Sequence, residues 1–154
     1  MIYLSDIIKT EVIPAMGISA LRFHYGYAEE LNKTLNQMEN NNQSFIWLVQ
    51  PFTFEVDGKI LAGTAKDVRF VIFGASDQDY TTSTRIEKVF KPLIDPLYDS
   101  FMNALKNCAW FEKTGFEHEV TDFSYWNDNQ LDDVMDLRNI TKLNLKIRKN
   151  ICKL

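Results

Sequence analysis

The sequence contains few of the residues that mark catalytic, metal-binding or disulfide-rich proteins. Its 154 residues include two cysteines, Cys108 and Cys152, and two histidines, His24 and His118. Disulfide-stabilised domains carry more cysteines than this, so we expect both thiols to be reduced, in an intracellular protein. No pair of cysteines or histidines has the two-to-four-residue spacing that structural zinc sites favour. We therefore expect neither a metal nor a cofactor.

Long apolar runs and an excess of basic residues are also missing. No run of 18 apolar residues occurs, and residues 1–6 lack the basic start and apolar stretch of a signal peptide. These features predict a soluble protein with no membrane partner. The net charge of −4 argues against a general nucleic-acid binder, which needs a basic face to release counterions from phosphate.

Nucleophile, magnesium and calcium patterns are incomplete. Cys108 has no third group to orient a histidine base, so we interpret it as a buried packing thiol and expect no enzyme; a hydrolase is the least favoured reading. Asp77 and Asp79 lack a glycine-rich phosphate loop, and the threonines and serine that follow them are interpreted as helix caps. A second group of acids does not match the calcium loop: Asp128, Asp132, Asp133 and Asp136. We interpret both acidic groups as solvated.

The apolar residues, 45% of the chain, are spread without a linker. This predicts one domain over residues 1–154. We expect an α+β fold: a mixed, mostly antiparallel sheet of about five strands, with one long proline-interrupted helix across a face and two shorter helices at the side.

Apolar periodicity predicts the individual elements. Helices are expected from Ser5, as the cap, to Pro14, over 28–39, and over 85–108. In the long helix, Pro92 should bend or split the chain, and Asp95 should cap a restart before Pro96. Strands are expected over 21–25, 44–54, 66–73, 117–125 and 139–148; the third is the core strand, and Pro51 gives the second an edge position or a bulge.

Asp57 and Gly58 are the strongest turn signal, because both tolerate the positive φ of a type I′ hairpin. We expect residues 52–56 to fold back onto 59–62 and the hairpin, around 52–62, to protrude. Its arms carry more apolar surface than a free hairpin should expose, so we predict interface residues there: Phe52, Phe54, Val56 and Ile60.

Charge is divided near the C-terminus. Residues 112–138 hold eight acids and two bases, whereas residues 139–154 hold five bases and no acid. The division is an ordinary solvated surface or, in a ring, a complementary head-to-tail contact that includes a basic tail at 148–154. Loop aromatics, Phe111 among them, are either satellite clusters or an interface core. The further interface candidates are Trp110, Tyr125, Trp126, Lys146, Arg148 and Lys149.

Several segments together resemble a known group of proteins. They are the N-terminal helix, the aromatic turn at 23–27, the strand at 45–48, the run from 79 through 85 to 98, His118, the pair at 125–126, the acids at 132–136 and the closing strand at 144–147. The combination resembles small neck and tail-connector proteins of tailed bacteriophages that infect Bacteroidetes, including the crAss-like phages.

The resemblance implies a homo-oligomeric ring of six or twelve copies, similar to tail-completion or tail-terminator proteins. Such a subunit is assembled in the host bacterial cytoplasm and lies in the virion neck or tail. Its partners are other neck, portal or tail proteins, and DNA passes through the ring only as cargo. The resemblance implies no catalytic residue. The alternative is a small intracellular adaptor or protein-binding domain that acts as a monomer or dimer.

Overall fold

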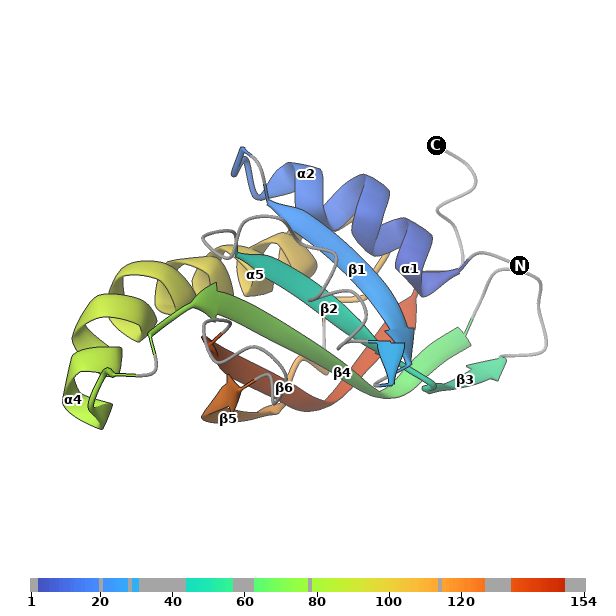
Figure 1. Ribbon diagram of the computed structural model, residues 1–154. Helices are drawn as coiled ribbons and strands as arrows, with labels where there is room; N and C mark the ends of the chain where they lie inside the picture. The colour runs from blue at the N-terminus through green and yellow to red at the C-terminus, as the bar shows by residue number, and fades with distance from the viewer. Residues whose placement is uncertain are drawn as a thin grey trace.

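The computed structural model describes residues 3–19, 21–27, 29–30, 44–56, 63–77, 79–113, 115–126 and 134–148. The strands are β1 (Arg22–Tyr27), β2 (Phe45–Gln50), β3 (Thr53–Val56), β4 (Gly63–Ala75), β5 (Glu119–Trp126) and β6 (Val134–Ile147). They form one sheet in the order β1-β2-β4-β6-β5, and β3 also pairs with β4 (Figure 1). Only β1 and β2 are parallel. The predicted mixed, mostly antiparallel α+β fold is confirmed, with six strands.

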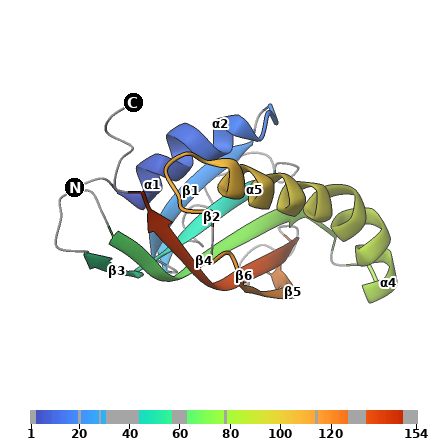
Figure 2. The same cartoon turned by 180° about the vertical axis from the view of Figure 1, so that it is seen from behind.

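A helix of 26 residues crosses one face of the sheet (Figure 2). It consists of α4 (Thr82–Arg85), the π-helical segment η2 (Ile86–Ile94) and α5 (Asp95–Asn107). Thr81 caps it, as predicted for this loop, by accepting a hydrogen bond from the Thr84 backbone amide at 3.2 Å. The helix curves but does not split at Pro92. Pro92 lies in η2, whose wider turn leaves more room for the proline ring.

The predicted restart of the helix at Asp95 is wrong. Asp95 has helical backbone angles, φ −58° and ψ −47°, because η2 continues directly into α5. Its carboxylate makes no cap and instead forms an ion pair with Arg138 at 2.8 Å. Asp95, which the sequence predicts to be a helix cap, therefore connects the helix to the sheet through Arg138.

A shorter helix near the N-terminus lies on the same face as the long one. It comprises α1 (Leu4–Ile7), η1 (Ile8–Val12) and α2 (Ile13–Ala15), and both Ile8 and Val12 are fully buried. The predicted helix is confirmed, but Ser5 does not cap it. Tyr3 occupies the cap position, and Ser5 is buried inside the first turn. In the described part of the chain, no helix has the length and apolar character needed to span a membrane.

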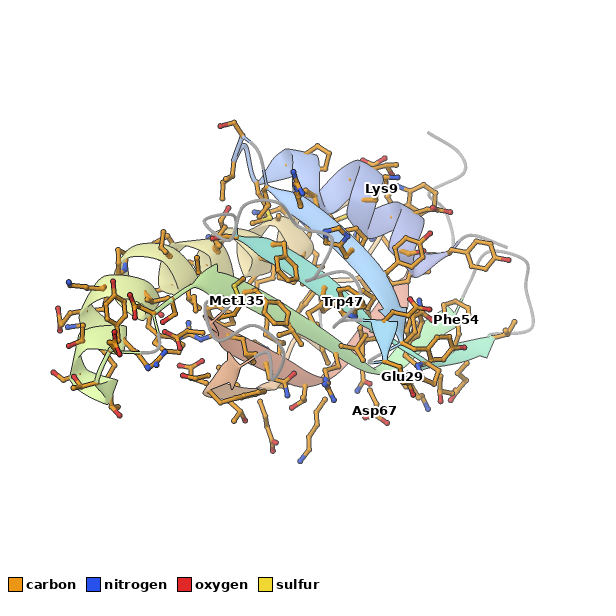
Figure 3. All side chains as sticks on the ribbon, in the orientation of Figure 1. Lys9, Glu29, Trp47, Phe54, Asp67 and Met135 are labelled. Atoms are coloured by element: carbon orange, nitrogen blue, oxygen red, sulfur yellow. The ribbon has the colours of Figure 1, made fainter. Side chains whose placement is uncertain are left out.

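Apolar side chains are buried on both faces of the sheet. The main core lies under the helices, where Phe70, Ile72 and Phe101 are fully buried. A second cluster lies on the opposite face and consists of Phe45, Trp47, Val71, Phe73, Met135 and Leu137. Figure 3 shows Trp47 and Met135 on that face. Burial on both faces explains the continuous apolar run of β4 and confirms it as the core strand.

Two strand predictions need correction. The single strand expected over 44–54 is two strands, because β2 ends at Gln50 and β3 begins at Thr53. Pro51 lies between them, so it leaves β2 in an interior position between β1 and β4. The predicted hairpin pairs in another register: Val56 lies opposite Gly63, not Lys59. Its turn and second arm (57–62), almost all of the helix predicted over 28–39, and the tail residues 149–154 lie outside the described residues.

Paired bulges interrupt β4 and β6, one on each side of the Val68–Leu143 pair. Asp67 is an extra residue in β4, and Lys142 is an extra residue in β6. Both have positive φ, +54° and +61°, a conformation uncommon for residues other than glycine. The Asp67 backbone amide donates a hydrogen bond to the Asn144 side-chain oxygen at 3.1 Å. Because each strand gains one residue, inward and outward positions exchange parity in both strands together.

Candidate functional site

A buried ion pair lies between the start of the long helix and the sheet. Arg85 Nη1 donates hydrogen bonds to Asp136 Oδ1 at 2.7 Å and to Ser76 Oγ at 2.9 Å. The Arg85 side chain is 10% exposed and that of Asp136 is fully buried. Ser76 and Ser124 also donate to the Asp136 carboxylate, at 2.6 and 2.7 Å. Three donors therefore compensate one buried negative charge, as such a charge requires.

Strand pairing places the members of this cluster together. Asp136 of β6 lies opposite Gly74 of β4 and Ser124 of β5, all on the face under the helix. A Cβ atom at Gly74 would lie 3.2 Å from Ile94 and 3.3 Å from Val89, so glycine permits the close approach of the helix. The helix can then bring Arg85 down onto the carboxylate.

The prediction that Asp136 is a solvated acid is wrong. Inward positions after the bulge are odd-numbered, as at Leu143 and Leu145, but before Lys142 they are even-numbered, as at Ile140 and Asp136. Counting back by twos from the end of β6 therefore places Asp136 on the wrong face. Sequence reasoning also missed Arg85 as its partner, because the two residues are 51 positions apart.

A second arginine extends the polar cluster along the helix. Arg138 binds Asp122 of β5 through two hydrogen bonds, at 2.8 and 2.9 Å, and Asp95 of the helix at 2.8 Å. Its guanidinium also lies over the Tyr98 ring, 5.1 Å from the centroid. The hydrogen bond to Asp122, with that to Asp95, holds the pKa of Arg138 well above its ordinary value. Arg138 thus joins β5, β6 and the helix as a permanent cation.

Tyr98 and His118 complete this region. The His118 Nδ1–H donates to the Phe116 carbonyl at 2.7 Å when the other ring nitrogen, Nε2, accepts from the Tyr98 hydroxyl at 2.5 Å. Burial raises the pKa of Tyr98, which keeps its hydroxyl protonated as a donor. His118 therefore orients a tyrosine and a loop, and neither of its described partners is Cys108.

A cavity of about 490 Å³ adjoins the polar cluster. Arg85, Asp95, Asp122, Ser124 and Arg138 contribute to its lining. The hydrogen bonds described above already pair each of these side chains within the chain. Their arrangement fixes the helix against two strands. Within the described ranges, no three His, Cys, Asp or Glu side chains form a group able to hold a metal ion.

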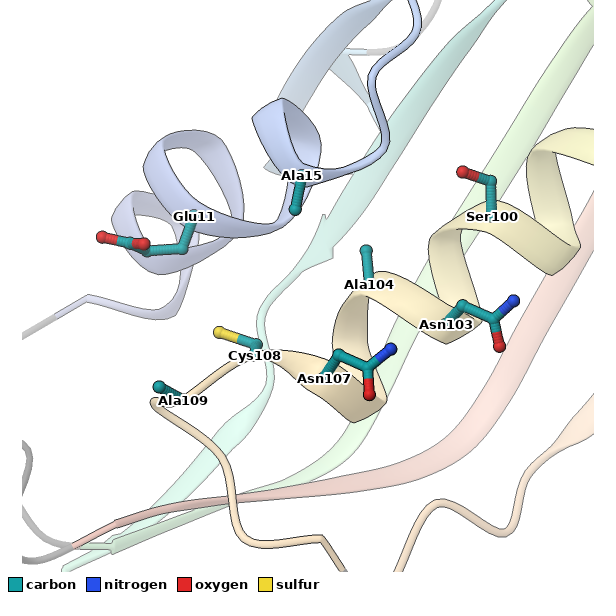
Figure 4. Close-up of a pocket in the computed structure, with 8 residues that line it drawn as sticks. All are labelled: Glu11, Ala15, Ser100, Asn103, Ala104, Asn107, Cys108 and Ala109. Carbon is teal, nitrogen blue, oxygen red and sulfur yellow. The ribbon is translucent and has the colours of Figure 1, made fainter.

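A groove of about 590 Å³ lies between the N-terminal helix and α5 (Figure 4). Small side chains, including Ala15 and Ala104, line it together with Glu11 and Asn107. Cys108 lies at its edge, 8% exposed and packed into the main core, and burial raises the pKa of its thiol. The interpretation of Cys108 as a packing thiol is confirmed.

The structure separates the predicted interface aromatics. Phe52, Phe54 and Trp110 are half-buried against the main core, whereas Val56 is 58% exposed. Phe111 is fully buried and forms a bridge with Ile147, so the possibility that it belongs to an interface core is wrong. Tyr125 and Trp126 belong to β5, and Ile60 and Lys149 lie outside the described residues.

Some of the divided charges meet inside the chain. Two acids of the 112–138 segment pair with bases of the 139–154 segment, Glu112 with Lys146 and Glu119 with Lys142, and Asp122 pairs with Arg138 of its own segment. Lys146 is a predicted interface residue, and its pair with Glu112 is loose at 3.6 Å. Exposed Arg148 donates its backbone amide to the Trp110 carbonyl at 2.9 Å. These pairs attach β5 and the preceding loop to β6.

The two outermost strands, β1 and β5, expose large side chains. Tyr25 and Tyr27 of β1 are each 52% exposed, and Val120 and Phe123 of β5 are 43% and 45% exposed. On its outer side, neither strand pairs with another described strand. Sequence patterns predicted both strands but not their edge positions, because strand order depends on pairings between distant segments. These edges are the sites in the described chain best suited to bind another polypeptide.

No protein-family model matches the sequence. No curated protein matches it either.

Proposed function

We propose that the chain is a structural virion protein, one subunit of a homo-oligomeric ring in the neck or tail of a bacteriophage. In this role the ring connects the portal to the tail, and DNA passes through it. The sequence resemblance to neck and tail-connector proteins supports the virion assignment. The arrangement of the sheet supports the assembly role.

One observation carries the assembly role: among the described strands, β1 and β5 form opposite edges of one sheet, and each pairs on one side only. An open edge presents unpaired backbone donors and acceptors to any strand that can reach it. A protein with two such edges can bind one neighbour on each side through different surfaces. Repeated contacts of that kind close into a ring when the rotation between neighbours permits it.

The test is the assembly state of the full-length chain. We expect its mass in solution, measured by light scattering over a range of concentrations, to correspond to six or twelve copies. Negative-stain images of the same sample should show rings with a central hole. A chain that stays monomeric at every concentration, and also when mixed with isolated virion necks, would contradict the proposal.

The groove between the N-terminal helix and α5 favours the alternative, a small adaptor or protein-binding domain. An adaptor would be a monomer or dimer in the same measurement. Replacing Asn107, an exposed residue that lines this groove, with tryptophan would then abolish partner binding. In a ring closed through the sheet edges, the same substitution leaves the oligomer intact.

A further inference from the structure

The directions of the two edge strands allow a repeating contact. β1 is parallel to β2, and each following step, from β2 to β4, to β6 and to β5, reverses direction. After three reversals, β5 runs opposite to β1. Two copies placed side by side in the same orientation therefore bring β5 of one copy against β1 of the next as an antiparallel pair.

We propose that β1 of one subunit pairs with β5 of its neighbour, so that one sheet continues around the ring. This inference rests on the proposed ring function and specifies the surface that closes it. The partner is a second copy of this chain, since a single chain supplies both halves of the pair. The interface is head-to-tail, and each subunit uses both edges.

Side-chain alternation restricts the register of this pair. Tyr25 and Tyr27 lie on the helix-covered face, because Tyr25 is paired with Leu48 and the two tyrosines are two residues apart. On β5, Val120 and Asp122 lie on that same face, opposite Ile140 and Arg138 of β6. A continuous sheet must keep these residues on one side, since a shift of one residue exchanges the faces.

Strand length then selects one register. β1 has six residues and β5 has eight. The register that places Arg22 opposite Tyr125 and Tyr27 opposite Val120 keeps every residue of β1 within β5 and preserves the faces. A shift of two residues in either direction leaves one residue of β1 beyond the end of β5. Only this register pairs the whole of β1.

The side chains that meet in this register are compatible. Tyr27 lies opposite Val120, so two half-exposed apolar groups cover each other. Tyr25 lies opposite Asp122, where the tyrosine hydroxyl is a donor and the carboxylate an acceptor. No two like charges face each other. The edge strand β1 also contains no proline or lysine, residues that commonly prevent edge-to-edge pairing. Its only Lys, Arg, Asp or Glu residue is Arg22.

Cysteine cross-linking tests the register directly. In the full-length chain with Cys108→Ala and Cys152→Ser, we combine Tyr27→Cys with Val120→Cys. Directly opposed residues in an antiparallel pair have Cα atoms about 4.5–5.5 Å apart, within the range that a disulfide spans. Mild oxidation should therefore produce a ladder of linked chains on a non-reducing gel, ending at six or twelve copies.

The matched control combines Tyr27→Cys with Thr121→Cys. Thr121 lies beside Val120 but on the opposite face of β5, so this variant should give no ladder. Each altered side chain in the test pair is about half-exposed, so folding should be preserved, and circular dichroism checks this.

A second test uses charge. Tyr25→Glu places a like charge opposite Asp122 and should abolish oligomers. Leu93→Glu, on the exposed side of the long helix, should not.

The outcomes separate this inference from the proposed function. Rings in images without cross-links in the Tyr27–Val120 pair would overturn the edge pairing and leave the ring function standing. A ladder with open filaments in place of rings would support the pairing and contradict the ring. Equal ladders in the test and control pairs would overturn the register. A chain that forms no oligomer would overturn both proposals.

Discussion

The two halves of the long helix bind the sheet by different means. The C-terminal half, α5, buries Leu97, Phe101, Met102 and Leu105 in the main core. The N-terminal half, α4 with η2, buries only Val89 and Ile94 as apolar residues, and it binds the sheet through Arg85. Asp95, at the junction, adds the pair with Arg138. One half packs by apolar contact, and the other by charged hydrogen bonds.

The two kinds of contact have different effects. Apolar burial stabilises the helix on the sheet, whereas the charged hydrogen bonds fix the orientation of the helix relative to the strands. Apolar burial is favourable in many relative positions, because it depends on area and has no required angle. The bonds of Asp136 and Arg138 have fixed distances and directions, so they are satisfied in one arrangement of helix, β5 and β6. The polar half therefore positions β5, which is the edge that we propose to bind the next subunit.

Among these predictions, a substitution that breaks the polar half should lower the free energy of unfolding the most. Asp136→Ala leaves Arg85 buried without its counter-charge, and loss of one partner of a buried pair costs about 3–5 kcal/mol. We expect the free energy of unfolding in urea to fall by that amount. Amide exchange should accelerate first in β5 and the start of β6. A loss below about 1 kcal/mol would contradict a structural role for the pair.

A matched replacement sharpens this test. Arg85→Met combined with Asp136→Leu removes both charges, and apolar replacement of a buried ion pair is often neutral or stabilising. The hydroxyls of Ser76 and Ser124 are only half-buried and can bind water in this variant. We expect most of the lost stability to return. If β5 also fixes the ring contact, assembly should not return to the same extent.

A truncation in the apolar half should cost slightly less and act differently. Leu105 is fully buried in the main core, and Leu105→Ala should lower the free energy of unfolding by about 2–5 kcal/mol. Because this loss affects the common core, amide exchange should accelerate across the sheet rather than in β5 alone. If amide exchange in Leu105→Ala accelerated only in β5, the apolar and polar halves of the helix would not differ in their effect on the sheet, and the comparison would fail.

The smallest expected effect lies where the two halves meet. Tyr98→Phe removes the hydrogen bond to His118 and keeps the ring that packs beside Arg138. A hydrogen bond of this kind contributes about 0.5–1.5 kcal/mol, so we expect a loss in that range. Urea denaturation of Tyr98→Phe and of Leu97→Ala under the same conditions compares the two losses in the free energy of unfolding. If Tyr98→Phe lowers the free energy of unfolding as much as Leu97→Ala does, then Tyr98 contributes more to the polar network than one hydrogen bond.

Sequence patterns predicted much of the scaffold and little of the site. The apolar periods of the two helices and the central strand are local, and each was found in its predicted place. The polar network depends on long-range pairing, since Asp136 meets Arg85 and Ser76 across 51 and 60 residues. The parity change at Lys142 concealed the inward side of β6. An aspartate at position 67 is a common choice for positive φ, but a lysine at position 142 carries no such signal.

The paired bulges at Asp67 and Lys142 divide the sheet along a crease. On one side lie β1, β2 and β5, and on the other the ends of β4 and β6 carry β3. Bulges increase local twist, so the β3 end leaves the plane of the larger part (Figure 1). In a ring closed through β1 and β5, the crease would separate the strands that bind neighbouring subunits from the β3 end. The β3 end, with exposed Val56, then takes no part in the contact that we propose between β1 and β5.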